Sequence, residues 1–146
     1  MSSFSLDLKR FAEKTKDKAN EAVGNIVVRV ASELDRRSPV GDASYWKHKP
    51  PKGYIGGHFR ANWQLGIGTL PTTEVAGVDP QGAATQGRIL AAIPDEAAGK
   101  VYYLANTAPY ALRLEHGWSR QAPQGLVGLT VTMFQEIVRD AVEALQ

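Results

Sequence analysis

The chain has 146 residues, a length that suits a single domain with its own hydrophobic core. Apolar residues make up 43% of it and charged residues 22%, which is typical of a soluble globular protein. It contains no cysteine, which excludes disulfides, a thiol nucleophile and cysteine-based metal sites. No apolar run approaches the roughly 18 residues that a membrane span needs, and the charged N-terminus lacks the apolar region of a signal peptide. We therefore expect neither export nor a membrane partner.

The charges are unevenly distributed along the chain. The net charge is only +2, yet basic residues outnumber acidic ones in the first 60 residues and acidic ones predominate in the rest. A nucleic-acid-binding domain usually carries a larger and denser basic surplus. The pattern therefore indicates an asymmetric polar surface rather than a dedicated nucleic-acid site.

The first element is a long amphipathic helix, predicted from about Ser5 to Arg36. Its end is predicted at Ser38-Pro39, because the residue before a proline is disfavoured in the helical region. Such a stripe usually forms core or a helix–helix seam. The apolar positions recur at steps of three and four along the whole segment: Phe4, Leu8, Phe11, Ala19, Ala22, Val23, Ile26, Val27, Val30, Ala31 and Leu34.

A long loop follows over residues 41–58, where glycine and proline are frequent and no hydrophobic period survives. Long loops in compact domains are usually functional or mobile. Aromatic side chains among lysines indicate a contact surface, although they are also compatible with packing back onto the core. The candidate contact residues are Tyr45, Trp46, Lys47, Lys49, Lys52 and Tyr54.

Residues from Phe59 to Gly68 alternate between apolar and polar, which predicts a half-buried strand with Trp63 in the core. A short strand is also expected over 72–78. An alanine-rich helix is expected over 83–93, and a second firm strand over 100–106.

One or two helical turns are expected over 110–116, stopped at Gly117, and a terminal helix from about Pro123 to Ala144. The predicted fold class is α+β. A long N-terminal helix and a C-terminal helix pack on a small, mainly antiparallel sheet, in one domain over 1–146.

The sequence contains only weak matches to catalytic and metal-binding motifs. The histidines His48, His58 and His116 show no metal-ligand spacing, and no phosphate loop, dinucleotide fingerprint or serine-hydrolase elbow occurs. A triad of Glu115, His116 and Ser119 would require three near-neighbours in sequence to converge, whereas known triads draw on separate parts of the chain. We therefore expect no catalytic residue, no metal and no cofactor.

The stretch 107–123, TAPYALRLEHGWSRQAP, carries a dense set of aromatic and polar side chains. One interpretation buries Tyr110, Leu112, Leu114 and Trp118 beside a strand, with Gly117 as a helix C-terminal glycine. The other is an interface, since aromatic residues and arginine are enriched at interface cores. The crowding of these residue types between two helices favours the interface.

Three segments together resemble a known family. They are RRSPVGDASYW after the long helix, GGHFRANWQLGIG, and YLANTAPYALRLEHGWSRQAPQGLVGLTV before the terminal helix. They are similar to the tail-completion and neck proteins of long-tailed bacteriophages, which include minor tail protein Z-like and head–tail joining proteins. The corresponding family patterns are "tPvdTG.lr.nw" and "i.N..pYa..lE.G.S.qaP.G". The loop after Gly41 is longer here than in the shorter relatives.

The resemblance implies a structural virion protein assembled in the host cytoplasm. It implies a ring, commonly of six subunits, at the head-proximal end of the tail, where it joins the head connector or stopper to the tail tube or terminator. DNA passes through its lumen in transient, non-specific proximity. The motif positions imply that residues here fix the turn before the terminal helix and present a docking edge. The motif positions are Asn106, Pro109, Tyr110, Glu115, Gly117, Ser119, Gln121, Pro123 and Gly125. The implied interface residues are Asn106, Tyr110, Arg113, Glu115, Gly117, Trp118, Ser119, Arg120, Gln121 and Pro123.

Two alternatives stay open at this point. A tail terminator, a ring that stops growth of the tail tube, would have a related fold at a different axial position. A small hydrolase using Glu115 and His116 belongs to another class. Self-assembly favours a ring protein, and loss of activity on substitution of His116 or Ser119 favours an enzyme.

Overall fold

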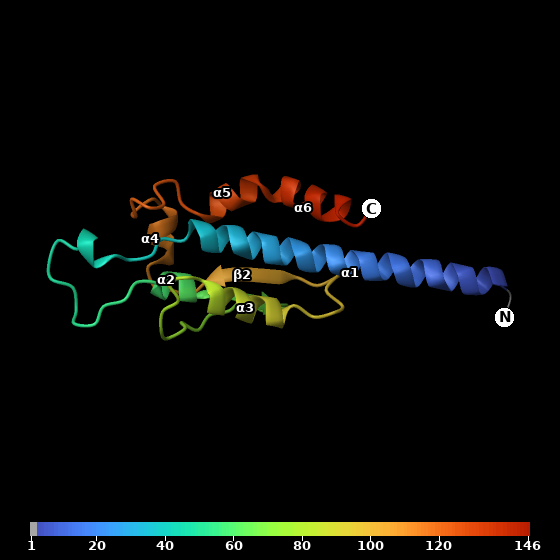
Figure 1. The fold of residues 1–146 in the computed structure, drawn as a ribbon, viewed down its shortest axis with the longest axis horizontal. Helices are drawn as coiled ribbons and strands as arrows, with labels where there is room; N and C mark the ends of the chain where they lie inside the picture. Colours follow the sequence, from blue (N-terminus) through green and yellow to red (C-terminus); the bar gives the residue numbers. More distant parts are fainter. Residues whose placement is uncertain (1–2) are drawn as a thin grey trace.

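A computed structural model describes residues 3–146 and shows an elongated molecule built around one long helix (Figure 1). In chain order its elements are α1 (Ser3–Arg37), the 3-10 turn η1 (Ala43–Tyr45), α2 (His58–Ala61), β1 (Trp63–Ile67), α3 (Ala83–Ala92), β2 (Tyr102–Asn106), α4 (Ala111–Glu115), α5 (Val127–Thr132) and α6 (Phe134–Glu143). Helices α5 and α6 run along one side of α1, and the strands and α3 lie on its other side. The predicted α+β class is confirmed, as are the helices at 83–93 and 110–116 and the strand at 100–106.

Helix α1 is buried only in its second half, where Ala22, Val27, Ala31 and Leu34 face the body. The helix ends as the proline at position 39 predicts, and the hydroxyl of Ser38 donates a hydrogen bond of 2.7 Å to the Leu34 carbonyl. Of the two interpretations of the apolar stripe, core therefore applies only to the second half of α1, because the first half projects beyond the body.

The sheet has two antiparallel strands, paired from Trp63 opposite Asn106 to Ile67 opposite Tyr102. Its inner side contributes to a core of buried side chains that joins α1, the strands and the C-terminal segment: Ala31, Leu34, Phe59, Trp63, Ile89, Ala108, Ala122 and Leu126. Trp63 is in the core, as predicted, and its indole N–H donates to the buried hydroxyl of Ser38 at 2.7 Å. This bond satisfies two polar groups inside the core.

The strand predicted from Phe59 begins four residues later, because residues 58–61 form the short helix α2. The Ala61 amide bonds back to the carbonyl of Gly57 at 2.9 Å, as in a helical turn. Phe59 and Trp63 are four residues apart, so both face the same side in a helical turn and in an alternating strand. The alternation alone does not separate the two conformations.

The strand predicted over 72–78 does not form. Val75 instead pairs with the side-chain amide of Asn62: its N–H donates to Oδ1 at 2.7 Å, and its carbonyl accepts from Nδ2 at 3.2 Å. Gln64 donates similarly to the Thr73 carbonyl at 2.8 Å. The segment is thus held by side-chain amides in place of a neighbouring strand.

The predicted terminal helix is divided into α5 and α6 and begins at Val127 rather than near Pro123. Gly125 has a φ of 80°, which a continuous helix does not allow. Near the break between α5 and α6, the hydroxyls of Thr130 and Thr132 donate to the carbonyls of Leu126 and Leu129 at 2.9 and 2.6 Å. Such bonds compete with the helical pattern.

Candidate docking surface at one end of the molecule

Two segments far apart in sequence meet at the end of the molecule opposite the projecting half of α1. They are the loop 41–57 and the turn 107–125, which contains α4 (Figure 1). The side chain of Gln121 joins the turn to Val40, the residue just before the loop. Its Oε1 accepts from the Val40 amide at 3.0 Å, and its Nε2 donates to the Val40 carbonyl at 2.8 Å. A shallow hollow of about 480 Å³ lies between them, with Tyr45, Tyr54 and Gln121 in its lining.

The loop closes on itself where Gly41 meets Gly56. A Cβ on Gly56 would collide with the Gly41 carbonyl oxygen, so this approach requires glycine. The rings of Trp46 and Tyr54 lie edge to face, with centroids 4.9 Å apart. These contacts hold the loop together and leave the side chain of Tyr45 exposed.

The loop begins with the short 3-10 turn η1, a few residues after Val40. The carboxylate of Asp42 accepts a hydrogen bond from the Ser44 amide at 2.8 Å and so caps η1. The bond to the Ser44 amide holds the pKa of the Asp42 carboxyl below its usual value. The aromatic positions that follow are therefore presented by a defined turn.

Glu115 fixes the start of α5 from the end of α4. Its Oε2 accepts from the amides of Leu126 and Val127 at 2.9 and 2.8 Å, and its Oε1 accepts from Gly128 at 3.0 Å. These amides have no partner within the helix, so the carboxylate is a cap supplied from a distance. Burial raises the pKa of Glu115, but the three amide bonds outweigh it and hold the pKa below its usual value.

Between α4 and α5, the chain turns at Gly117, which has a φ of 84°. A Cβ here would also meet the carbonyl oxygen of Pro123, so the predicted helix-stopping glycine is confirmed. The Trp118 amide donates to the Arg113 carbonyl at 3.2 Å, and the Arg113 guanidinium lies 5.2 Å from the centroid of the Trp118 ring. Trp118 is held by this cation–π contact but stays 72% exposed.

Many of the exposed side chains at this end are apolar, aromatic or basic. We call them the loop-end surface: Tyr45, Trp46, Lys47, Lys49, Lys52, Leu112, Arg113, Trp118 and Arg120. Leu112 is 75% exposed. The interpretation that buries Leu112 and Trp118 beside the strand is therefore wrong.

The remaining motif positions hold the turn internally. Asn106 donates to the Phe59 carbonyl at 2.8 Å and accepts from the Ala108 amide at 3.0 Å. The Ser119 hydroxyl accepts from the Gln121 amide at 3.2 Å, and Pro123 is exposed next to it. These residues therefore act on a partner indirectly, by fixing the positions of the exposed side chains around them.

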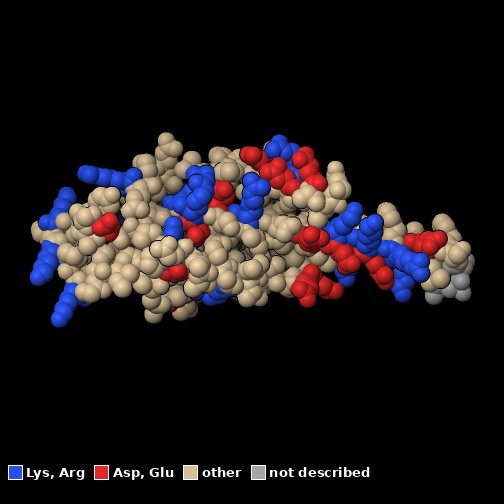
Figure 2. All heavy atoms as spheres, viewed as in Figure 1, with Lys and Arg blue, Asp and Glu red and all other residues tan. Residues whose placement is uncertain are grey.

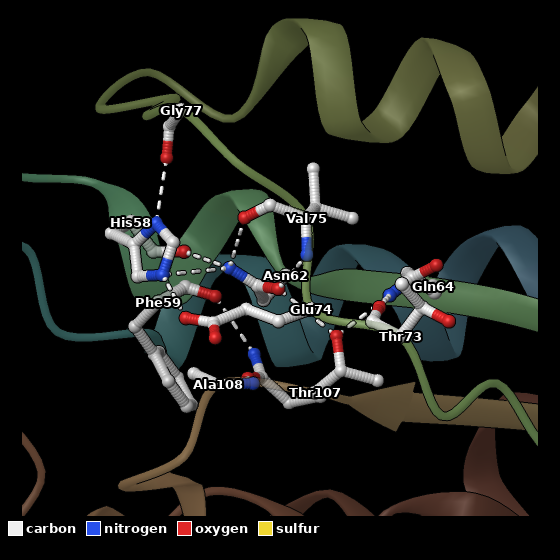
Figure 3. A network of polar contacts seen from close by, with 11 residues as sticks. His58, Phe59, Asn62, Gln64, Thr73, Glu74, Val75, Gly77, Thr107 and Ala108 are labelled. Carbon is white, nitrogen blue, oxygen red and sulfur yellow. Dashed lines mark hydrogen bonds and ion pairs between the residues drawn. The ribbon is translucent and has the colours of Figure 1, made fainter.

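Behind the surface lies a polar network that no sequence motif indicated (Figure 3). Its centre is the fully buried Asn62, which also donates to the His58 carbonyl at 2.8 Å and accepts from the Thr107 hydroxyl at 2.9 Å. The two ring nitrogens of His58 lie 2.7 Å from the Gly77 carbonyl and 2.7 Å from a carboxylate oxygen of Glu74. The network ties α2 to the segment 73–77 and to the start of the turn.

Tyr110 connects this network to the turn. Its ring lies 6.4 Å from that of His58 and 6.3 Å from that of Phe59, measured between centroids. Burial, with the nearby charges of Tyr54 and Glu74, raises the pKa of the Tyr110 phenol. Tyr110 is 37% exposed and lies at the boundary between core and surface.

Basic side chains project from this end of the molecule (Figure 2). Within residues 3–146, none of Lys47, Lys49 and Lys52 forms an ion pair, and all three are exposed. Arg60, the next lysine or arginine along the chain, does not extend this group of exposed lysines, because its side chain is partly buried. Its guanidinium donates to the carbonyls of Pro80 and Asp35 at 2.6 and 3.0 Å.

Glu115, His116 and Ser119 are close in sequence, but no hydrogen bond between their side chains occurs in the described residues. The Glu115 carboxylate is bound to three amides, and the Ser119 hydroxyl to one. Residues 3–146 contain no cluster of three or more histidine, aspartate or glutamate side chains that could hold a metal ion. In the same range, no helix is long and apolar enough to cross a bilayer.

Comparison of the chain with protein-family models, with curated proteins and with solved structures found no match.

Proposed function

We propose that this protein is a structural component of a long-tailed phage particle, forming a ring at the head-proximal end of the tail and joining tail to head connector. The observation that carries the proposal is the loop-end surface, where exposed aromatic, leucine and arginine side chains stand on a turn fixed by Glu115, Gly117 and Gln121. The motif resemblance over 36–46, 56–68 and 103–131 supports the assignment to a virion neck.

The residue types of the surface suit a protein partner. The few residues that dominate the binding energy of protein interfaces are enriched in Trp, Tyr and Arg, and rigidly held side chains lose less conformational entropy on binding. Trp118 is held by its amide bond to Arg113 and by the guanidinium over its ring. It is therefore exposed and ordered at once, which favours docking over a merely mobile surface.

The basic loop fits a position near DNA without tight binding. Lys47, Lys49 and Lys52 are few and lie on one exposed loop. A lumen that held phosphates through many contacts would impede passage of the genome, because each phosphate contact adds to affinity. In a ring, one surface of each subunit contacts a different surface of the next, and the ring closes when the rotation between neighbours closes.

The test is cryo-electron microscopy of particles from cells that produce this protein, with complementation by variants. We expect ring density between connector and tail tube, and we expect Trp118→Ala to reduce incorporation at least tenfold, with unjoined heads and tails accumulating. Leu90→Ala is the matched control, since Leu90 is exposed on α3. Absence of the wild-type protein from the particle overturns the assignment, and normal incorporation of Trp118→Ala overturns the role of the loop-end surface.

A further inference from the structure

The projecting half of α1 carries an apolar stripe that no part of residues 3–146 covers. Phe4, Leu8 and Phe11 are 74%, 57% and 69% exposed, and every residue from 3 to 19 is exposed. A row of large apolar side chains on one face of a helix is characteristic of a helix–helix contact. Their spacing of four and three positions, with Thr15 four further on, is that of a coiled-coil seam.

This stripe continues the face of α1 that α6 covers. Eighteen residues make about five whole turns of helix, so Phe11 points in the same direction as Arg29, and Leu8 in the same direction as Ile26. Arg29 lies under α6, because its guanidinium pairs with the Asp140 carboxylate at 3.1 Å. Further along, Arg37 donates to the sulfur of Met133 at 3.1 Å.

Helix α6 runs antiparallel to α1 and ends over its middle (Figure 1). Asp140 lies opposite Arg29 and the chain ends six residues later, which brings Gln146 to about the level of Val23. Beyond that level, no element within residues 3–146 lies on this face, which has room for a further helix on the same line as α6. The open length matches the projecting half of α1 itself.

We propose that this face binds the same face of a second copy, with the two α1 helices antiparallel. The charges beside the seam argue for this occupant. Asp7 and Lys14 flank the stripe on one side, seven residues apart, and neither has an ion-pair partner within residues 3–146.

In an antiparallel pair, this side of one helix faces the same side of the other. With Leu8 opposite Phe11 of the second copy, each Asp7 comes next to the other copy's Lys14, which forms two ion pairs. A parallel pair would place Asp7 and Lys14 beside Ala12 and Ala19, which carry no charge. The sequence therefore selects the antiparallel arrangement, because charge complementarity at these flanking positions sets orientation.

The test is sedimentation equilibrium of the purified full chain over a concentration series, with a single chain at 15.8 kDa as reference. We expect a reversible dimer. Leu8→Asp is expected to weaken it at least about 100-fold, because each copy loses a buried leucine and places a carboxylate in the seam. An unchanged dimer in Leu8→Asp, or a single chain at every concentration, overturns the proposal.

A charge exchange tests the register. Asp7→Lys alone and Lys14→Asp alone each create two like-charge contacts, and each is expected to weaken the dimer about 3- to 10-fold at low salt. The double variant restores both pairs and is expected to return to within about twofold of wild type. Lys9→Asp, on the far face of α1, is the matched control and should have no effect. Failure of the double variant to recover overturns the antiparallel arrangement.

This pairing does not depend on the proposed function. The dimer is measured on purified protein, whereas the ring assignment is tested by incorporation into particles. A dimer without incorporation would contradict only the ring, and incorporation without a dimer would contradict only the pairing.

Discussion

At the scale of single residues, two side-chain amides take the place of a neighbouring strand. Asn62 pairs with both backbone groups of Val75, and Gln121 pairs with both backbone groups of Val40. An amide side chain offers one donor and one acceptor in the arrangement of a peptide group, so it satisfies an extended segment that lacks a ladder. Gln121 anchors the start of the loop 41–57 in this way, and Asn62 anchors the segment 73–77.

His58 makes one of these anchors sensitive to pH. Its ring nitrogens face two acceptors, the Gly77 carbonyl and the Glu74 carboxylate. The neutral ring has one N–H and can donate to only one of them, whereas the protonated ring donates to both. The bond to Gly77, followed by that to Glu74, raises the pKa of His58 above 6.5, although burial opposes them. Asn62 also approaches Nε2, but at 3.4 Å, and Tyr110 is the other titratable group packed against the ring.

The stability that His58 contributes should therefore be fully present below pH 6.5 and lost as the pH rises through the higher folded-state pKa. We expect the free energy of unfolding to fall by about 1 kcal/mol or less over this range, since the pair is partly exposed. His58→Gln should flatten the dependence. Urea unfolding at several pH values between 6 and 8.5 measures it, and a wild-type stability that rises with pH over this range would contradict the assignment.

At the scale of elements, the Glu115 carboxylate determines where α5 begins, because it accepts hydrogen bonds from the first amides of that helix. Replacement by glutamine keeps one acceptor oxygen and loses the other, and we expect a loss of about 1 kcal/mol of stability; alanine loses both and should cost about 2–3 kcal/mol. Because the pKa of Glu115 is lowered, this contribution is present above the unfolded-state value of 4.5 and is lost as pH falls through the folded-state value. Denaturant unfolding at pH 7 provides the measurement.

Glu136→Gln is the matched control for this prediction, because Glu136 is an exposed carboxylate in the first turn of α6 with no ion pair in the described residues. It should change stability by less than about 0.5 kcal/mol. Equal effects of Glu115→Gln and Glu136→Gln would show that the distant cap contributes nothing specific.

The elements with a long, regular hydrophobic period could be predicted from the sequence, and those fixed by distant side chains could not. Periodicity gave α1, α3 and β2, because local spacing decides which residues share a face. It missed the amides that replace a strand at 72–78. Gln121 and Val40 are 81 residues apart, so their contact forms only in the folded chain and local spacing cannot predict it.

The candidate site divides in the same way. Residue types drew attention to 107–123, and Gly117 was recognisable as a helix stop. The role of Glu115 was not recognisable, since its amide partners lie 11 to 13 residues further along. Nor does periodicity reveal whether an apolar face is covered: Leu8 and Ile26 belong to one stripe, but Leu8 is exposed and Ile26 is partly buried.

At the scale of the whole molecule, stability is concentrated at one end of α1. The core joins the second half of this helix to the sheet, α3 and the C-terminal segment, and Ile137 on α6 is almost fully buried. In the described part of the first half, the exposed ion pair between Lys16 and Glu96 at 3.2 Å connects the helix to the body. Such pairs contribute about 0–1 kcal/mol.

Deleting residues 1–15 should therefore lower the free energy of unfolding of the monomer by less than about 1 kcal/mol, because the deleted part that the structure describes buries no side chain. Ile137→Ala should cost about 2–5 kcal/mol, since it leaves a cavity between α6 and α1. Denaturant unfolding at concentrations below the dimer range gives both values. If the deletion costs as much as Ile137→Ala, the projecting half of α1 supports the fold, and its apolar stripe is then not a surface held in reserve for a second copy.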